Sequence, residues 1–300
     1  MLKFKPQYKE KPWGGRRFQE KFGRELPSDA PFGESWELVD MEGGQSIVTD
    51  GEHAGKPIGE LWRAGIVGGR GEGAFPFGLK WLDTTDYLSV QVHPDEEFCN
   101  NTLLGAPKTE AWLITHVEPK SKLLIGNYPG LDAHLLKQAV ERRTVRKWMY
   151  EAGPRQGEIY LVEAGTMHAI GGGFLMLEVQ QPSDTTFRIF DWERPGLDGK
   201  PRELHLDEAA ACVRYNRFDL PQPYRDKVVG PCFQMELKPM GSAVPDAGLR
   251  VLVAHEGNSR LLIDGSPVTL MYGDVAVLEA SESVVSVGLG SCMLITEPAN

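Results

Sequence analysis

Short runs of apolar residues, separated by glycine, proline and polar residues, recur along most of the chain. This pattern is typical of strands joined by tight turns, and it predicts a core that is mainly β. The chain carries 34 glycines and 21 prolines, so turn residues are available throughout its length. The runs that predict strands cover residues 35–40, 79–82, 88–92, 111–115, 122–125, 158–163 and 174–179.

Three segments depart from the strand pattern and predict helices. Residues 131–150 place most of their apolar side chains on one face at a spacing of about 3.6 residues. Residues 60–64 predict a second, short helix. Residues 207–213 predict a third, with Asp207 as its N-cap, because aspartate is a preferred capping residue. After about residue 215 only strand-like runs remain.

Two segments far apart in the chain resemble each other. Residues 157–164 and 273–280 both begin with glycine and an acidic residue and continue with a mainly apolar run that ends in Glu-Ala. The first leads into a Gly-Thr-Met-His turn that ends at His168, whereas the second leads into a segment without histidine. We therefore predict two related β-barrel modules, residues 1–214 and 215–300. Only the first would carry metal ligands, and the helical segment would be an insertion in it.

Composition narrows the class of protein. A chain of 300 residues that is 41% hydrophobic can bury one large core or two ordinary ones. Its formal charge of −10 argues against nucleic acid and anionic membranes as partners. No run approaches the roughly 20 apolar residues of a membrane span, and the charged N-terminus lacks the apolar stretch of a secretory signal. Four scattered cysteines suit free thiols in a reducing compartment, so we expect a cytoplasmic protein.

Four polar residues are candidate metal ligands. Gln91 and His93 are two apart in a Val-rich run, so on a strand both side chains point to the same face. Glu110 precedes the predicted strand 111–115, and His168 ends the Gly-Thr-Met-His turn. Two imidazoles and one carboxylate are good zinc ligands, and such a set leaves a coordination position open, as a catalytic site requires. Spacing alone leaves a structural role for these histidines as open as a metal-binding one.

Several ordered blocks of the chain together resemble the type I phosphomannose isomerases in their short bacterial and archaeal form. The blocks cover residues 12–15, 33–37, 79–83, 88–95, 108–112, 165–170, 178–188 and 202–205. The resemblance implies a pair of cupin jelly rolls, with helices inserted in the catalytic one. It also implies the interconversion of mannose 6-phosphate and fructose 6-phosphate with one bound zinc ion per chain.

The resemblance also assigns functions to particular residues. The family's zinc ligands fall on His93, Glu110, His168 and, as a weaker fourth, Gln91. Its functional arginine falls on Arg188, at the end of the block that begins at Glu178 and contains Asp184. The chain departs from the family at Glu163, where a proline is common, and this predicts a less rigid turn before the last ligand.

Aldose–ketose isomerisation moves a proton between two carbons, so it needs a base and a group that holds the developing oxyanion. Glu178 is the first candidate for the base, because burial would raise its pKa towards the working pH. Alternatively, it orients a ligand histidine. Arg188 stays protonated and suits either the ene-diolate or the phosphate. Lys108 would share a strand face with Glu110 and is a second cationic candidate for catalysis.

Ser89, Asp184 and Arg194 are the predicted substrate-binding residues. Arg194 and Ser89 would hold the phosphate, while an equally open alternative leaves Arg194 as a solvated loop charge. The expected partner is a small-molecule sugar phosphate, and the expected assembly is a monomer or a homodimer.

Two other classes of function stay open. The two histidines and the glutamate could hold iron(II) in a different cupin enzyme, such as an oxygenase. The chain could also bind sugar phosphates without turning them over.

Overall fold

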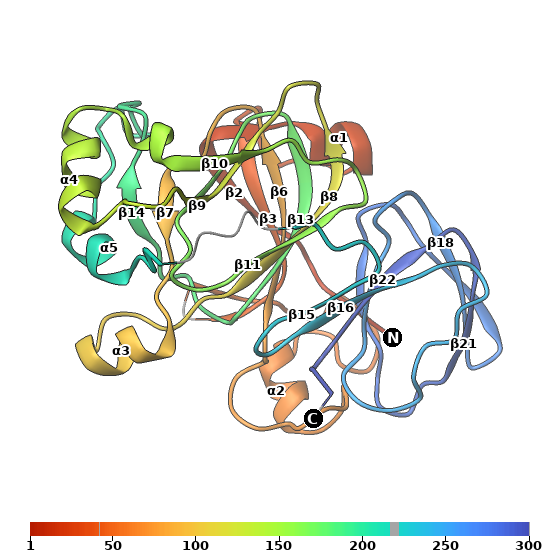
Figure 1. Cartoon of the computed structure of the whole chain (residues 1–300). Helices are drawn as coiled ribbons and strands as arrows, with labels where there is room; N and C mark the ends of the chain where they lie inside the picture. The colour runs from red at the N-terminus through yellow and green to blue at the C-terminus, as the bar shows by residue number, and fades with distance from the viewer. Residues whose placement is uncertain (42, 217–221, 300) are drawn as a thin grey trace.

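The computed structural model describes residues 1–41, 43–216 and 222–299, and sheets dominate it, as predicted (Figure 1). Each run predicted as a strand overlaps an observed strand, although the ends differ by a few residues. None of the described helices combines the length and the apolar character needed to cross a membrane.

Two antiparallel sheets form the first group of strands. One sheet runs in the order β11 (Ile159–Val162), β8 (Glu110–Val117), β13 (Phe174–Gln180), β6 (Gly78–Thr84), β3 (Phe32–Leu38) and β2 (Gln7–Gly15). The other runs in the order β10 (Met149–Ala152), β9 (Leu123–Asn127), β12 (His168–Ile170), β7 (Val90–Val92) and β14 (Phe187–Phe190). Apolar side chains from both sheets, including Leu82, Trp112, Ile125 and Ile170, pack in one buried cluster. The two sheets therefore enclose a core between them, as in a jelly-roll barrel.

The second group of strands lies towards the C-terminus. One sheet runs in the order β1 (Leu2–Lys3), β20 (Val275–Val277), β17 (Val251–Val253), β22 (Cys292–Thr296), β16 (Gln234–Lys238) and β15 (Lys227–Val229). The other contains β19 (Ser266–Leu270), β18 (Ser259–Ile263) and β21 (Val284–Leu289). A separate pair is formed by β4 (Asp40–Met41) and β5 (Gly44–Gln45). The two similar segments noted above each contain a strand, β11 in the first group and β20 in the second.

The two groups of strands are joined by more than the chain between them. Leu2 of β1 pairs with Val277 of β20, so the N-terminal strand completes the C-terminal sheet. One buried cluster contains Trp81 from the first group together with Val251 and Ile295 from the second. The division at residue 214 stays a prediction, and any boundary there crosses a continuous core.

The helices are α1 (Arg17–Phe22), α2 (Ile58–Arg63), α3 (Glu96–Thr102), α4 (Ala133–Glu141) and α5 (Leu206–Cys212), with a 3₁₀ turn η1 (Val145–Trp148). Figure 1 shows α4 and α5 side by side next to β14, at the end of the molecule away from the C-terminal sheets. The predicted short helix at 60–64 is confirmed as α2. The helix α3 was not predicted; Asp95 caps it by accepting a hydrogen bond from the Phe98 N–H at 2.8 Å.

Two helix predictions need correction. The segment 131–150 is α-helical only as far as Glu141, and Arg143 then takes a positive φ of 57°. Met149 pairs with Asn127 at the edge of the β9 sheet, so sheet pairing overrides the helical spacing of the last apolar residues. Asp207 is not the cap of α5: His205 occupies that position, and Asp207 lies in the first turn, where it pairs with Lys137 of α4.

Candidate metal centre

His93, Glu110 and His168 converge on one buried point, with ligand atoms that all lie within 4.8 Å of one another. The Nε2 atom of His93 lies 3.3 Å from one carboxylate oxygen of Glu110, and the Nε2 atom of His168 lies 3.4 Å from the other. Each of the three side chains is 1% exposed. The strands explain this convergence, because His93 follows β7, His168 begins β12, and Glu110 begins β8 on the facing sheet.

Backbone carbonyls fix the orientation of both imidazole rings. The Nδ1 of His93 lies 2.8 Å from the carbonyl of Thr185, and the Nδ1 of His168 lies 2.8 Å from the carbonyl of Thr166. Because a carbonyl only accepts, each Nδ1 carries the proton and each Nε2 presents its lone pair to Glu110. The Lys108 ammonium lies 2.7 Å from Glu110 Oε2, so this buried carboxylate is ion-paired and stays charged. A pair of oriented lone pairs and a charged carboxylate fit a divalent metal of the zinc or iron(II) type.

Burial keeps the two histidines in the state that a metal requires. It lowers the pKa of His168 to about 4, although the charge of Glu110 opposes this. Burial and the positive charge of Lys108 also lower the pKa of His93. Burial alone would raise the pKa of Glu110, but Lys108 and the imidazoles outweigh it and hold that pKa well below its usual range. Near neutral pH the set is therefore two neutral imidazoles and one carboxylate, all competent to bind metal.

Gln91 lies beside this set rather than within it. It faces His168 across β7 and β12, and its Nε2 lies 3.2 Å from the Nε2 of that histidine. The Ser89 hydroxyl donates to the Gln91 side-chain oxygen at 3.2 Å. Gln91 is only half-buried, which is consistent with its place as the weakest of the four candidate metal ligands.

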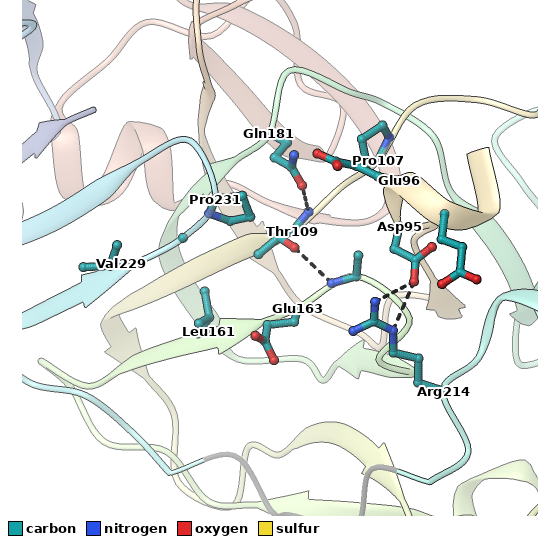
Figure 2. Close-up of a pocket in the computed structure, with 13 residues that line it drawn as sticks. Asp95, Glu96, Pro107, Thr109, Leu161, Glu163, Gln181, Arg214, Val229 and Pro231 are labelled. Atoms are coloured by element: carbon teal, nitrogen blue, oxygen red, sulfur yellow. Dashed lines mark hydrogen bonds and ion pairs between the residues drawn. The ribbon is translucent and has the colours of Figure 1, made fainter. Parts of the chain in front are cut away.

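A set of hydrogen bonds holds the ligand-bearing segments together. Figure 2 shows the two that Thr109 forms, in a view of a second cavity of about 360 Å³. Thr109 donates its backbone N–H to Gln181 at 2.8 Å and accepts at its hydroxyl from the Ala164 N–H at 3.0 Å. Gly165, with a φ of 81°, donates to the His93 carbonyl at 2.8 Å. The turn before His168 is therefore fixed by hydrogen bonds, without the proline that Glu163 replaces.

A polar cavity of about 260 Å³ opens beside the three converging side chains. The predicted residues that line it are Ser89, Gln91, Lys108, Glu178, Asp184 and Arg188. Arg194 does not line it, because its guanidinium is paired with Asp86 and Asp191, both at 3.1 Å. The structure thus brings the predicted residues together with that one exception. The alternative for Arg194, a solvated loop charge, does not fit either, because its side chain is 13% exposed and held by two carboxylates.

Glu178 and Lys108 form the wall of the cavity nearest to Glu110. Burial raises the pKa of Glu178 to about 7, and the charge of Glu110 adds to the rise while Lys108 opposes it. The Lys108 Nζ lies 2.7 Å from Glu110 and 4.0 Å from Glu178. Burial would lower the pKa of Lys108, but these two carboxylates raise it, so the ammonium stays charged. The backbone carbonyls of Thr185 and Thr166 already orient the two histidines, which is the alternative role considered for Glu178.

Sequence reasoning missed several residues of the cavity wall. They are Lys11, Trp13, Glu34, Lys80 and Arg202. Lys80 is 3% exposed, lies opposite Glu178 across β6 and β13, and pairs with Asp184 at 3.1 Å. A signal was present in the sequence, because Lys80 interrupts an otherwise apolar strand, and a charge there needs a buried partner.

The family model described as "Phosphomannose isomerase type I, catalytic domain" matches residues 1–109. Mannose-6-phosphate isomerase ManA of Bacillus subtilis (strain 168) is 38% identical over 217 residues, which cover 71% of this chain and 67% of that protein. Probable mannose-6-phosphate isomerase GmuF of the same organism is 34% identical over 247 residues, covering 81% and 74%.

The crystal structure of the mannose 6-phosphate isomerase from Bacillus subtilis matches this fold with a TM-score of 0.86 at 27% identity. The match covers 99% of both chains, so it includes the C-terminal sheets as well as the candidate site. The resemblance carried by the sequence blocks is thereby confirmed: the chain belongs to the type I phosphomannose isomerase family.

Proposed function

We propose that the protein interconverts mannose 6-phosphate and fructose 6-phosphate, and that His93, Glu110 and His168 hold a zinc ion for this reaction, with Gln91 as a weaker fourth ligand. The observation that carries the proposal is the contact between this ligand set and the wall of a polar cavity: the cavity-lining Lys108 lies 2.7 Å from Glu110, and Glu178, a carboxylate of raised pKa, lies beside that lysine. A zinc ion bound there would polarise the sugar carbonyl as a Lewis acid.

Glu178 is the residue that we assign to proton transfer. A carboxyl group whose pKa is about 7 is partly ionised near neutral pH, so it can accept a proton from carbon and return it. In the forward direction the Glu178 carboxylate takes the proton from C2 of mannose 6-phosphate and gives an ene-diol(ate). The resulting carboxylic acid returns this proton to C1, and the hydroxyl proton moves from O2 to O1, which completes fructose 6-phosphate without any net gain or loss of atoms.

Lys108 stabilises the negative charge that develops on the sugar oxygens, and Arg188 adds a second positive charge to the cavity. Lys108 is held beside Glu178 in its charged form, so its ammonium donates hydrogen bonds to an oxyanion in the cavity. Arg188 extends from β14 into the same cavity, where its buried Nε has no partner among the described residues. Ser89 and Asp184 complete the polar wall and suit the sugar hydroxyls, one as a hydroxyl donor and the other as an acceptor.

An iron(II) oxygenase would use the same three ligands, so the donor set does not separate the two reactions. The rest of the cavity favours the isomerase. Its wall carries a base and several cations, which suit a sugar phosphate and an anionic intermediate.

The deciding experiment measures isomerisation of mannose 6-phosphate by the protein as purified, after treatment with a chelator, and after zinc is added back. We expect activity to be lost with the chelator and restored by zinc. Absence of turnover by fully zinc-loaded protein would contradict the proposed reaction, and restoration by iron(II) alone, with oxygen uptake, would favour the oxygenase.

A further inference from the structure

The cations that line the 260 Å³ cavity differ in whether a carboxylate neutralises them. Three lysines each have a close acidic partner: Lys11 with Glu34 at 2.8 Å, Lys80 with Asp184 at 3.1 Å, and Lys108 with Glu110 at 2.7 Å. Arg188 forms no ion pair with any residue that the structure describes; its Nη1 donates instead to the backbone carbonyl of Glu203 at 2.6 Å. The end of the cavity at Arg188 therefore carries uncompensated positive charge.

Arg202 brings a second guanidinium to the same end. The segment that contains it runs beside β14, because the His205 N–H donates to the Arg188 carbonyl at 2.8 Å and the Arg188 side chain reaches Glu203. Arg202 and Arg188 both line the cavity. Their proximity has an electrostatic signature: burial, and then the positive charge of Arg202, lowers the pKa of Arg188. Both guanidiniums carry a positive charge, as arginine side chains do in proteins.

Asp191 fixes the position of Arg202. Its carboxylate, on a residue that is 5% exposed, accepts from Arg202 Nε at 2.6 Å and from Arg202 Nη2 at 2.5 Å. The remaining amino group, Nη1, donates to no described residue. Asp191 also pairs with Arg194, so its single negative charge is divided between two guanidiniums. The cluster formed by Arg188 and Arg202 therefore keeps a net positive charge.

The strand register sets the distance between this cluster and the candidate metal centre. His168, Gln91 and Arg188 face one another across β12, β7 and β14. Two interstrand spacings of about 4.8 Å therefore separate His168 from Arg188, which is roughly 10 Å. A hexose 6-phosphate carries its carbonyl and its phosphate at opposite ends. With the carbonyl at the metal centre, the phosphate lies on the side of the two arginines.

We propose that Arg202 binds the phosphate group of the substrate together with Arg188, and that Asp191 positions Arg202 for this contact. The assignment rests on the proposed function for the identity of the sugar, whereas the anion site itself follows from the charges. Two adjacent guanidiniums can offer paired N–H donors to phosphate oxygens, a geometry that lysine does not provide. The pair would then select phosphorylated over free sugars, and Arg194, turned towards Asp86, would have no part in it.

The test compares Arg202→Gln, Arg194→Gln and Arg225→Gln in the zinc-loaded protein. Arg225 pairs with Glu158 at 3.2 Å and does not line the cavity. Arg225→Gln therefore removes the same charge at a position away from the proposed phosphate site. Titration with inorganic phosphate in a calorimeter measures anion binding without turnover. Steady-state rates then give kcat/KM for mannose 6-phosphate and for mannose. Zinc content and thermal unfolding verify that each variant is folded, and Arg202→Lys retains the charge while removing the paired donors.

We expect Arg202→Gln to weaken phosphate binding and to lower kcat/KM for mannose 6-phosphate by roughly tenfold to a hundredfold, the range for a lost charged hydrogen bond. The kcat/KM for mannose should stay within about twofold, and Arg202→Lys should fall between the two. Unchanged phosphate binding in folded Arg202→Gln, or a loss in Arg194→Gln instead, would overturn the assignment. Wild-type protein that binds phosphate at Arg202 but turns over no sugar phosphate would contradict the proposed function and leave this site in place.

Discussion

Two glutamates a few ångströms from the same lysine have opposite pKa shifts, and this difference separates their roles. Glu110 lies 2.7 Å from Lys108 and faces two imidazoles, so its charged form is stabilised and its pKa falls. Glu178 is equally buried but lies 4.0 Å from that lysine, and the charge of Glu110 acts against its ionisation. Environment rather than residue type therefore suits one carboxylate to bind a metal and the other to act as a base.

The pKa of Glu178 gives a prediction about pH. Because the base must be ionised, kcat/KM for mannose 6-phosphate should rise with pH through a single acidic limb that lies no higher than about pH 7. A bound metal cation would favour the carboxylate and move the limb below that value. Glu178→Gln should bind substrate, lose this limb and lower kcat by about 10²-fold to 10⁴-fold. Rates across the pH range and exchange of the C2 proton with solvent measure both effects; unchanged exchange would place the base elsewhere.

His168 allows a direct test of the metal centre. Removing one of three protein ligands should abolish zinc retention and isomerase activity together in His168→Ala. His134→Ala is the matched control, because His134 lies exposed on α4 and its substitution should change neither quantity. Metal analysis after gel filtration gives the zinc content. Full activity of His168→Ala without bound metal would remove this residue from the site.

At the scale of elements, strand pairing decides which side chains share the cavity. Lys80, Glu178 and Trp112 lie side by side across β6, β13 and β8, and His168, Gln91 and Arg188 do so on the facing sheet. Side chains on a strand alternate between its two faces, so a shift of one residue in any pairing would move a whole row out of the cavity.

The end of β2 provides a test of this positioning. Gly14 lies so close to Phe32 and Gly33 that an added methyl group would collide with their backbone. Gly14→Ala should therefore destabilise the protein by about 1–3 kcal/mol and displace the neighbouring Trp13 from the cavity wall, which raises KM for mannose 6-phosphate. In the control Gly153→Ala the nearest atom is the flexible end of Lys122, 3.3 Å away. Denaturant unfolding and steady-state kinetics measure the two effects, and equal behaviour of the two variants would refute the argument.

At the scale of the whole molecule, the C-terminal sheets cover the first pair of sheets rather than standing apart from it. The Trp81 indole N–H, on β6, donates to the Gly273 carbonyl of the C-terminal group of strands at 3.0 Å. Strand β1, at the N-terminus of the chain, pairs with β20 of the C-terminal sheet. The apolar cluster that contains Trp81 includes residues of both groups of strands. Whether the protein is a monomer or a homodimer stays a prediction.

Truncation tests this interdependence. A chain of residues 1–214 would leave β1 without its partner β20 and expose the half of the shared cluster that contains Trp81. We expect this fragment to lack a cooperative thermal transition and to aggregate, whereas the full chain unfolds cooperatively. Circular dichroism and light scattering during heating measure the difference. A fragment that melts cooperatively with full activity would mean that the two groups of strands fold independently.

Local pattern was sufficient for the features that depend on residues close together in the chain. Alternation and turn residues predicted the strands, and the motifs around His93, Glu110 and His168 indicated three side chains that the structure brings together, because each motif holds its own turn or strand. The apolar spacing of residues 131–150 was misleading after Glu141, because the chain turns at Arg143, forms the 3₁₀ turn η1 and enters the strand β10 at Met149. The strand residue that pairs with Met149 is Asn127, which lies outside that segment.

Only the tertiary structure decided which charges face each other. Lys80 and Arg202 reach the cavity because their strands and loops lie beside Glu178 and Arg188, and Arg194 leaves it because Asp86 and Asp191 hold it. The raised pKa of Glu178 likewise comes from burial between two sheets. The sequence determined the strands, the ligand motifs and the family, because these are properties of short segments. The cavity's charges depend on pairings between segments far apart in the chain, and those exist only once the sheets have formed.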